Sequence, residues 1–346
     1  MNLSDFDYDL PEALIAQEPA PVRDQSRLMI VDRRSGGIRH TVFKTFHQHL
    51  QRGDVLVVNN SRVIPARLKG RKATGGGVEV LLLARKVPGT SREQTWEALL
   101  KPARNVRPGT SLWFAEGCEA QVRERISEKK WLLDFSVVPS FDEFIEQLGV
   151  PPLPPYIKRG KDQVNSVQDR ERYQTIYARV PGSVAAPTAG LHFSPEVLNE
   201  VAGSSVVIAG ITLHVGYGTF SPVVEEQLEN HRMDKEIYEI SDESARIING
   251  GKRVVAVGST SMRTLETSAD EAGKVKAGKA ATGLFIYPGY RFKRVNALLT
   301  NFHLPKSTLY LLVCSFAGRE LVREAYRQAI EERYRFYSYG DCMLIL

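Results

Sequence analysis

The fold is decided by the stretch Val254-Val255-Ala256-Val257-Gly258-Ser259-Thr260-Ser261-Met262-Arg263. Its apolar half predicts a buried strand, its glycine and hydroxyl residues predict a turn, and a helix is expected from about Ser261. Backbone N–H groups at the start of such a helix bind a carboxylate or phosphate, and an arginine adds a bidentate contact. The alternative is an intrahelical pair of Arg263 and Glu266 without a function. The ligand-binding residues predicted from this stretch are Ser259, Thr260, Ser261, Arg263 and Glu266.

Helices and strands alternate on both sides of this stretch. The expected elements are a helix over 194–202, a strand over 206–215, a helical stretch over 307–335 that is interrupted near Gly318, and a closing strand over 342–346. Residues 1–53 have the same mixed character. This alternation predicts an α/β domain with a mixed sheet. The segment 273–281 is rich in Lys, Gly and Ala, and we expect it to be a mobile loop.

A different pattern occupies the chain between these two parts. The run 54–58 predicts a buried strand, and short strands separated by glycine and proline turns follow it. The expected strands lie at 78–87, 95–101, 111–114, 119–126 and 131–137. So many short strands predict a small antiparallel β-barrel. The polar run 121–126 indicates exposure or an edge, and a helix is expected at 141–149. The predicted domains are residues 1–60 and 151–346 for the α/β domain and residues 61–150 for the inserted barrel.

The composition restricts the class of protein. The chain has 346 residues, 42% of them hydrophobic, which suggests about two domains. Its formal charge of +6 permits a polyanionic partner without showing one. Cys118, Cys314 and Cys342 lie far apart, so neither a disulfide framework nor a metal site is expected. An acidic N-terminus and the lack of a long apolar run predict no signal peptide, no transmembrane helix and a cytoplasmic location.

The loop Ala185-Ala186-Pro187-Thr188-Ala189-Gly190-Leu191-His192-Phe193 carries the first candidate histidine. Its small residues let the backbone approach a bound molecule closely. Ser194-Pro195 follows as a helix cap and a first helical residue, so Thr188 and His192 are expected on a loop that leads into a helix. The alternative is a tight turn with a core histidine. Three further stretches of the same character favour a site.

Two further candidate stretches lie at the ends of predicted strands. Asn59-Asn60-Ser61-Arg62 offers two amides and a guanidinium to a ligand, with a polar turn and a solvated arginine as the alternative. In Leu213-His214-Val215-Gly216-Tyr217-Gly218-Thr219-Phe220, the glycines would open the backbone and Tyr217 could stack on a base. The alternative for this stretch is a hairpin-like turn that keeps His214 in the core.

The remaining candidates lie in three polar stretches. The residue spacing matches no metal site in the first stretch, Asn230-His231-Arg232-Met233-Asp234-Lys235-Glu236. Two interpretations remain for it: general acid/base work by His231 or Glu236, or a solvated charge run. Thr300 to Thr308 places Asn301 and His303 before a helix. Arg333 to Asp341 interleaves cations with aromatics, which suits nucleic acid or a mixture of core and exposed residues, and Asp341 could reach the cleft.

In these segments the chain resembles the S-adenosylmethionine:tRNA ribosyltransferase-isomerase family of queuosine biosynthesis nearly end to end. The resemblance is carried by Asp9 to Pro11, Ile15 to Gln17, Arg23 to Arg27, Asn59 to Val63, Leu153 to Ile157, Tyr173 to Thr175, Ala185 to Phe193, Gly216 to Phe220, Arg263 to Glu266, Thr300 to Pro305 and Tyr337 to Asp341. The family usually has a histidine at the position of Asp234, so an essential acid/base role there is not expected.

The resemblance implies a fold and a reaction. The fold is an α/β hybrid-barrel domain with a small inserted β-barrel. The enzyme would transfer and isomerise the ribosyl unit of S-adenosylmethionine onto 7-aminomethyl-7-deazaguanine at the wobble position of a tRNA. The products would be epoxyqueuosine in tRNA, adenine and methionine. S-adenosylmethionine is then a consumed co-substrate, no metal is implied, and we expect a monomer.

This chemistry assigns expected roles. A base must remove a proton from the ribose C5′ beside the sulfonium, and an acid must assist the departure of adenine. The candidates for both roles are His192, His214, His303 and Glu236. Ser259 to Arg263 would hold the methionine carboxylate, and Glu266 or Tyr217 would face the sulfonium. The further substrate-binding candidates are Asn59, Asn60, Arg62, Thr188, Asn301 and Asp341.

The tRNA is expected to present one flipped nucleotide to the cleft. The basic residues expected along its backbone are Arg67, Lys69, Arg71, Lys72, Lys158, Arg159 and Lys161. Two rival functions are a methyltransferase and a non-catalytic RNA-binding module. The first would need a glycine-rich E/D-x-G-x-G-x-G loop, which the sequence lacks, and the second leaves the histidine-bearing loops unexplained.

Overall fold

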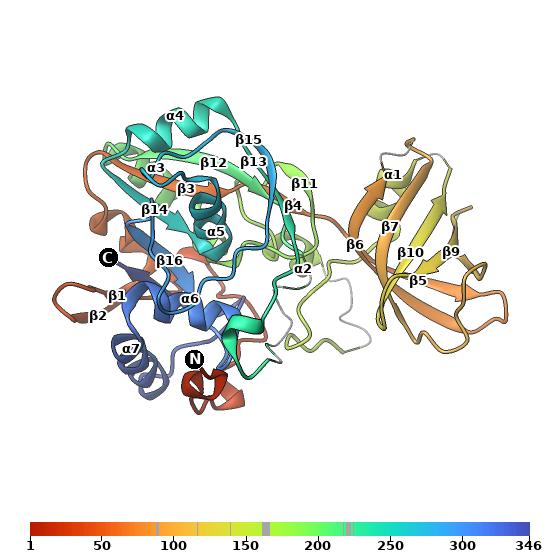
Figure 1. The fold of residues 1–346 in the computed structure, drawn as a ribbon, viewed down its shortest axis with the longest axis horizontal. Helices are drawn as coiled ribbons and strands as arrows, with labels where there is room; N and C mark the ends of the chain where they lie inside the picture. Colours follow the sequence, from red (N-terminus) through yellow and green to blue (C-terminus); the bar gives the residue numbers. More distant parts are fainter. Residues whose placement is uncertain are drawn as a thin grey trace.

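A computed structural model describes residues 1–87, 90–115, 117–138, 140–160, 167–216, 218, 223 and 225–346. It consists of a large α/β body, which contains both ends of the chain, and a smaller β-barrel that projects from one side (Figure 1). Both have hydrophobic cores of their own. The predicted α/β class with a small antiparallel barrel is confirmed.

The large body is built on a nine-stranded mixed sheet. In spatial order its strands are β15 (Gly278–Thr282), β13 (Glu236–Ile240), β12 (Val207–Leu213), β3 (Asp54–Asn59), β14 (Arg253–Val257), β16 (Ala297–Asn301), β17 (Cys342–Ile345), β1 (Arg27–Val31) and β2 (Ile38–Val42). The central strands contain continuous apolar runs because both faces are covered. Val55 and Val57 enter one core, whereas Leu56 and Val58 enter the other.

Helices cover the two faces of this sheet. Residues of α4 (Asp242–Gly250), α5 (Gly258–Ser268), α6 (Thr308–Ala317) and α7 (Arg319–Glu331) share one core, and α3 (Pro195–Gly203) contributes to the other. The side chain of Ser194 caps α3 by accepting from the Val197 N–H. Gly318, at φ +89°, separates α6 from α7 as the sequence predicts. None of the helices in the described ranges combines the length and apolarity that a membrane span needs.

The barrel is closed and entirely antiparallel. Its strands follow the order β10 (Lys130–Ser136), β7 (Glu93–Lys101), β6 (Gly77–Val87), β5 (Arg67–Lys72), β8 (Ser111–Trp113) and β9 (Glu119–Arg125). Inward residues such as Leu68, Ala98 and Leu133 are fully buried. Helix α1 (Phe141–Leu148), capped by Ser140, packs Phe141 into the same core.

Short elements join the two bodies. Strand β4 (Ser61–Val63) leads out of the large body and pairs in parallel with β11 (Val180–Ser183), and α2 (Val167–Arg172) lies between the barrel and β11 in the chain. The hydroxyls of Ser61 and Ser183 lie 2.8 Å apart in this pair. The domain boundaries after residues 60 and 150 stay predictions.

Four local expectations differ from the structure. The segment 273–281 is not a loop throughout, because Gly278–Thr282 pairs with β13 as the sheet's edge strand β15. Of the two alternatives for the polar run 121–126, exposure is correct for its polar residues, whereas an edge is wrong because β9 lies between β8 and β10. Strand β5 escapes the hydrophobic pattern because it presents one buried apolar residue among five polar residues or glycine. Helix α5 begins at Gly258, where φ is +85°, three residues before the expected start.

Candidate active site

Four parallel strands bring the predicted loops to one edge of the sheet. β12, β3, β14 and β16 run in the same direction, so their carboxyl ends meet there. Asn59 ends β3, His214 follows β12, Gly258 follows β14 and Asn301 ends β16. The Asn59 amide also donates to Thr260 Oγ1 at 3.4 Å, which links β3 to the start of α5. The sheet therefore gathers residues from distant parts of the sequence at a single edge.

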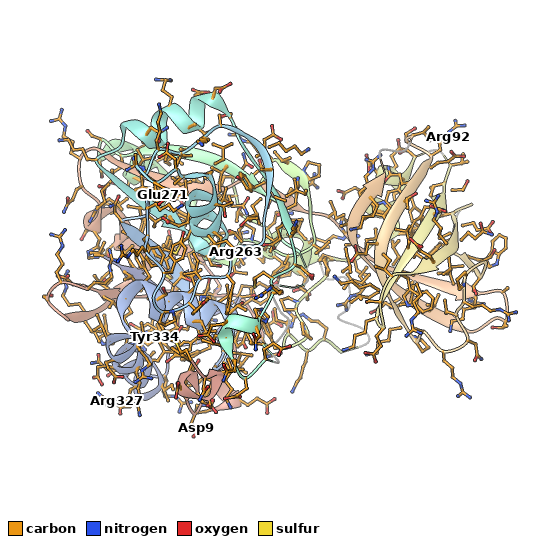
Figure 2. The ribbon with its side chains drawn as sticks, viewed as in Figure 1. Asp9, Arg92, Arg263, Glu271, Arg327 and Tyr334 are labelled. Atoms are coloured by element: carbon orange, nitrogen blue, oxygen red, sulfur yellow. The ribbon has the colours of Figure 1, made fainter. Side chains whose placement is uncertain are left out.

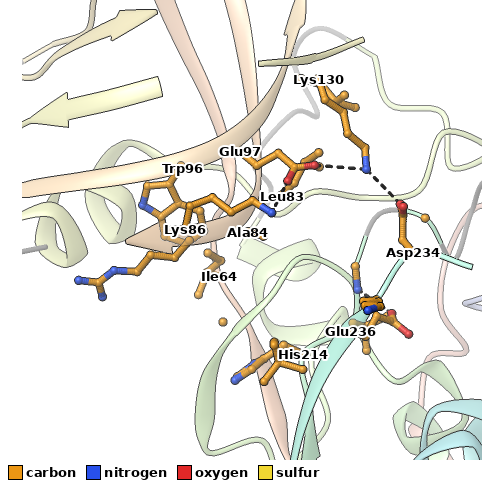
Figure 3. Close-up of a pocket in the computed structure, with 18 of the residues that line it drawn as sticks. Ile64, Leu83, Ala84, Lys86, Trp96, Glu97, Lys130, His214, Asp234 and Glu236 are labelled. Atoms are coloured by element: carbon orange, nitrogen blue, oxygen red, sulfur yellow. Dashed lines mark hydrogen bonds and ion pairs between the residues drawn. The ribbon is translucent and has the colours of Figure 1, made fainter. Parts of the chain in front are cut away.

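A cleft of about 1480 Å³ lies between this edge and the barrel. The barrel side combines apolar residues, such as Ile64, Leu83, Trp96, Leu99 and Ile145, with charged residues, such as Lys86, Glu97 and Lys130. The sheet side presents polar groups, among them His214 and Glu236 (Figure 3). Pockets for one small molecule commonly have about 300–1,000 Å³. The cleft is thus large enough for a small molecule together with part of a second ligand.

His214 is the histidine that lines this cleft. Its ring packs against Gly182, whose φ is +138° and where an added Cβ would lie 2.8 Å from the ring. Nδ1 of His214 is buried and has no hydrogen-bond partner among the described residues. Burial lowers the pKa of His214, and the positive charge of Lys279 lowers it further. The imidazole is therefore held neutral, in the form that accepts a proton.

Glu236 lies beside His214 at the start of β13. One carboxylate oxygen accepts from the Gly216 N–H at 2.9 Å, and the other accepts from Nη1 of Arg263 at 2.6 Å. Both side chains are nearly inaccessible to solvent, at 5% and 3% exposed. Arg263 lies inside the large body and also donates to the carbonyl of Leu284 (Figure 2). A buried ion pair with a backbone contact at each end fixes the carboxylate in one orientation.

A chain of ion pairs crosses the cleft. Lys86 pairs with Glu97 at 2.6 Å, Glu97 pairs with Lys130 at 3.2 Å, and Lys130 reaches Asp234 of the large body at 3.2 Å (Figure 3). A second contact joins Arg62, which also lines the cleft, to Glu146 of α1 at 3.3 Å. These pairs are partly exposed, so each contributes little free energy and can open.

Comparison with known proteins identifies the family. The family model described as "Queuosine biosynthesis protein" matches residues 3–345. The chain belongs to the queuosine biosynthesis protein family. Two relatives named S-adenosylmethionine:tRNA ribosyltransferase-isomerase, from Syntrophus aciditrophicus and Symbiobacterium thermophilum, are 54% and 52% identical over the full length of both chains. A solved structure of an S-adenosylmethionine tRNA ribosyltransferase from Thermotoga maritima is 37% identical, with a TM-score of 0.54 over 99% of this chain and all of that one.

Membership of the queuosine biosynthesis protein family confirms the resemblance that the sequence motifs indicate, and with it the prediction that the chain is an enzyme. Family membership does not by itself assign roles to individual residues. The remaining candidates are therefore judged by where the structure places them. Within the residues that the structure describes, no group of three His, Cys, Asp or Glu side chains is arranged to hold a metal ion.

His192 and Thr188 lie next to Asn301, outside the cleft. Nδ1 of His192 is 2.7 Å from Ser26 Oγ, and its Nε2 accepts from the Asn301 amide at 3.1 Å. The Thr188 hydroxyl donates to Oδ1 of the same amide at 3.1 Å. His303 is also buried, with Nε2 2.8 Å from the Thr300 hydroxyl. Because polar neighbours occupy these groups, they hold the strand-end loops together.

Several other predicted ligand-binding groups also have protein partners. Glu266 accepts from the backbone N–H groups of Lys293, Arg294 and Val295 at 2.7–3.0 Å. The Asp341 carboxylate accepts from two backbone N–H groups at 2.8–2.9 Å. The further residues near this edge that do not line the cleft are Asn59, Asn60, Ser259, Thr260 and Ser261. Tyr217 lies outside the described residues.

The two buried histidines predict a dependence of stability on pH. Burial lowers the pKa of His192 and of His303 to about 3, against about 6.5 in the unfolded chain. Between these values the unfolded state binds more protons, so stability is complete above pH 6.5 and falls as the pH drops below it. Each imidazole contributes up to about 1.4 kcal/mol per pH unit.

Denaturant unfolding should therefore show a loss of about 2 kcal/mol between pH 6 and pH 5. The variant His303→Gln removes one of these groups and should reduce this change by about 1 kcal/mol. The variant His40→Gln, on the exposed strand β2, should leave it intact. A free energy of unfolding that stays constant from pH 7.5 to pH 5 would contradict this assignment.

The barrel wall of the cleft was not predicted as part of the site. Trp96, Glu97 and Lys130 lie on barrel strands, where alternation reveals an exposed or a buried side but not what lies opposite. Gly182 was missed because its role depends on the ring of His214, 32 residues away in the sequence. For this wall the sequence offers one weak signal, which is that Trp96 lies in a strand that also contains acidic and basic residues.

Proposed function

We propose that the protein transfers and isomerises the ribosyl moiety of S-adenosylmethionine onto 7-aminomethyl-7-deazaguanine at the tRNA wobble position. The products are epoxyqueuosine in tRNA, adenine and methionine. The supporting observation is the cleft that places His214 and Glu236 opposite the barrel wall that carries Trp96. The names of the relatives support the reaction class. Since tRNA is the acceptor, we expect the protein to act in the cytoplasm, as a monomer.

His214 is the proposed base. The sulfonium of S-adenosylmethionine acidifies the hydrogens on the adjacent ribose C5′, and a neutral imidazole can remove one of them. His214 is neutral and lines the cleft, and its ring makes no hydrogen bond through the buried Nδ1 to any described residue. His192 and His303 are neutral too, but their rings bond to neighbours and lie outside the cleft. The proton therefore passes to His214 in this proposal.

Glu236 and Arg263 are the proposed partners of His214. Glu236 presents a carboxylate at the cleft surface that can accept a hydrogen bond from a ribose hydroxyl, while the proton that His214 has taken from C5′ is the one available to the departing adenine. Arg263 holds this carboxylate from behind at 2.6 Å. Arg62 lines the cleft and supplies a positive charge for the methionine carboxylate or a phosphate. Glu266 and Asp341 keep structural roles.

Product analysis tests the proposal. The purified protein is incubated with S-adenosylmethionine and tRNA that carries 7-aminomethyl-7-deazaguanine, and the small molecules are separated by chromatography. We expect adenine and methionine in equal amounts, formed only when both substrates are present. S-adenosylhomocysteine would indicate methyl transfer instead. tRNA binding without any consumption of S-adenosylmethionine would indicate an RNA-binding module.

A further inference from the structure

Most of the basic residues that the sequence offers for tRNA contact are engaged elsewhere. Lys72 donates its ammonium group to two backbone carbonyls at 2.9 and 2.7 Å, and Arg159 pairs with buried Asp169 at 2.9 Å. Arg67 donates to the backbone carbonyl of Leu153, and Lys158 pairs with Glu12. Lys69 and Arg71 are exposed on β5 but do not line the cleft. Lys161 lies outside the described residues.

Three other lysines stand on the two sides of the cleft. Lys129 lies in the turn between β9 and β10 on the barrel side, Lys235 immediately precedes β13, and Lys279 lies on the edge strand β15. All three line the cleft and are exposed. No carboxylate in the described part of the chain forms an ion pair with any of them. Their charges are therefore available to a ligand that spans the opening.

We infer that Lys129, Lys235 and Lys279 form a two-sided phosphate-binding surface, which holds the tRNA backbone on both flanks of the nucleotide that enters the cleft. This inference rests on the proposed function. Flipping one nucleotide out of a loop leaves a phosphate on each side of it, so both walls need positive charge. Lysine ammonium groups supply such charge without base preference, and binding releases the counterions of the RNA.

The Lys130–Asp234 ion pair lies between the two sides of this surface. An incoming phosphate competes with Asp234 for Lys130, because both are anions at the same cation. Replacing Lys130 would be uninformative, since it also neutralises Glu97, whose side chain is only 10% exposed. Asp234→Asn removes the competitor alone. Loss of this competitor should tighten tRNA binding. If the Lys130–Asp234 pair served only to hold the two bodies together, its loss would weaken that contact and would not tighten tRNA binding.

The test is the salt dependence of tRNA binding. Binding of an unmodified tRNA transcript is measured over a range of salt concentrations for the wild type and for the triple variant Lys129→Gln/Lys235→Gln/Lys279→Gln. Each lost phosphate contact lowers the slope of log K against log salt by about 0.7–0.9, so the slope should fall by about 2–3. The matched control Lys69→Gln/Arg71→Gln/Arg107→Gln removes three charges from exposed barrel residues outside the cleft.

The outcomes separate this inference from the proposed function. A slope that falls for the cleft variant and not for the control supports the surface. An unchanged slope in the cleft variant, or a fall in the control instead, overturns it. Adenine release by the wild type is measured in parallel with tRNA that carries the aminomethyl base. If the wild type binds tRNA but releases no adenine, the proposed function fails. The salt slopes of the variants still show whether the RNA binds at the three cleft lysines.

Discussion

Replacing His214 by alanine should lower the rate of adenine release from S-adenosylmethionine by at least about a hundredfold. General-base catalysis by a positioned side chain contributes about 10²–10⁴ to a rate, and His214 is the histidine that lines the cleft. The loss should appear in kcat at saturating concentrations of both substrates. The variant should remain folded, because the ring is packed against Gly182 at the cleft surface and makes no side-chain hydrogen bond among the described residues.

Two comparisons make this result specific. His40→Gln removes an exposed histidine on β2, at the other end of the sheet from the cleft, whose ring forms hydrogen bonds with Tyr334 and Gln328. This variant should leave the rate unchanged. Gly182→Ala keeps the imidazole but places a methyl group 2.8 Å from its present position, so the ring must move. We expect an intermediate loss in kcat for this variant. A rate within about threefold of wild type for His214→Ala would exclude His214 as the base.

Replacing Glu266 by glutamine should destabilise the protein by about 3 kcal/mol without altering turnover by the folded fraction. The carboxylate is 1% exposed and accepts three backbone N–H groups and the Tyr290 hydroxyl. In glutamine, one of these oxygens becomes an NH₂ donor. It then faces another donor, the N–H of Lys293 or those of Arg294 and Val295, which loses its partner in a buried site.

The measurement is denaturant unfolding combined with adenine release per folded molecule. Glu271→Gln is the matched control, because Glu271 (labelled in Figure 2) is 93% exposed and its ion-pair partner among the described residues is Lys293 Nζ. Its substitution should change stability by no more than about 0.5 kcal/mol. If Glu266→Gln instead abolishes turnover and leaves stability unchanged, the carboxylate acts on a substrate, as the sequence motif alone suggests.

The sequence predicted those parts of the fold whose signals are local. The apolar run at 54–58 became β3, Ser194 caps α3, and Gly318 divides the last two long helices. Each signal depends on neighbouring residues, which is why it can be seen in one dimension. Strands β5 and β15 were missed because pairing with other strands stabilises them, and most of their own residues are polar, small or glycine.

The candidate site was only partly accessible to the same reasoning. Residue types identified sixteen candidate residues equally well, from Asn59 to Asp341, but they could not rank these candidates. His192, His214 and His303 each follow the same sequence pattern, and they differ only in what surrounds the ring. Ser26 and Asn301 enclose the first, Thr300 engages the third, and a cleft faces the second.

By itself the sequence determined the α/β class, the small barrel and the gathering of polar loops at strand ends, because hydrophobic periodicity and turn chemistry act between residues close in the chain. The tertiary structure alone decided which of those loops faces the barrel, and therefore that His214 and Glu236 line the cleft while Glu266 and Asp341 hold backbone. Contact between groups such as Lys130 and Asp234, which are 104 residues apart, depends on how two separately folded bodies meet, and no local pattern encodes that.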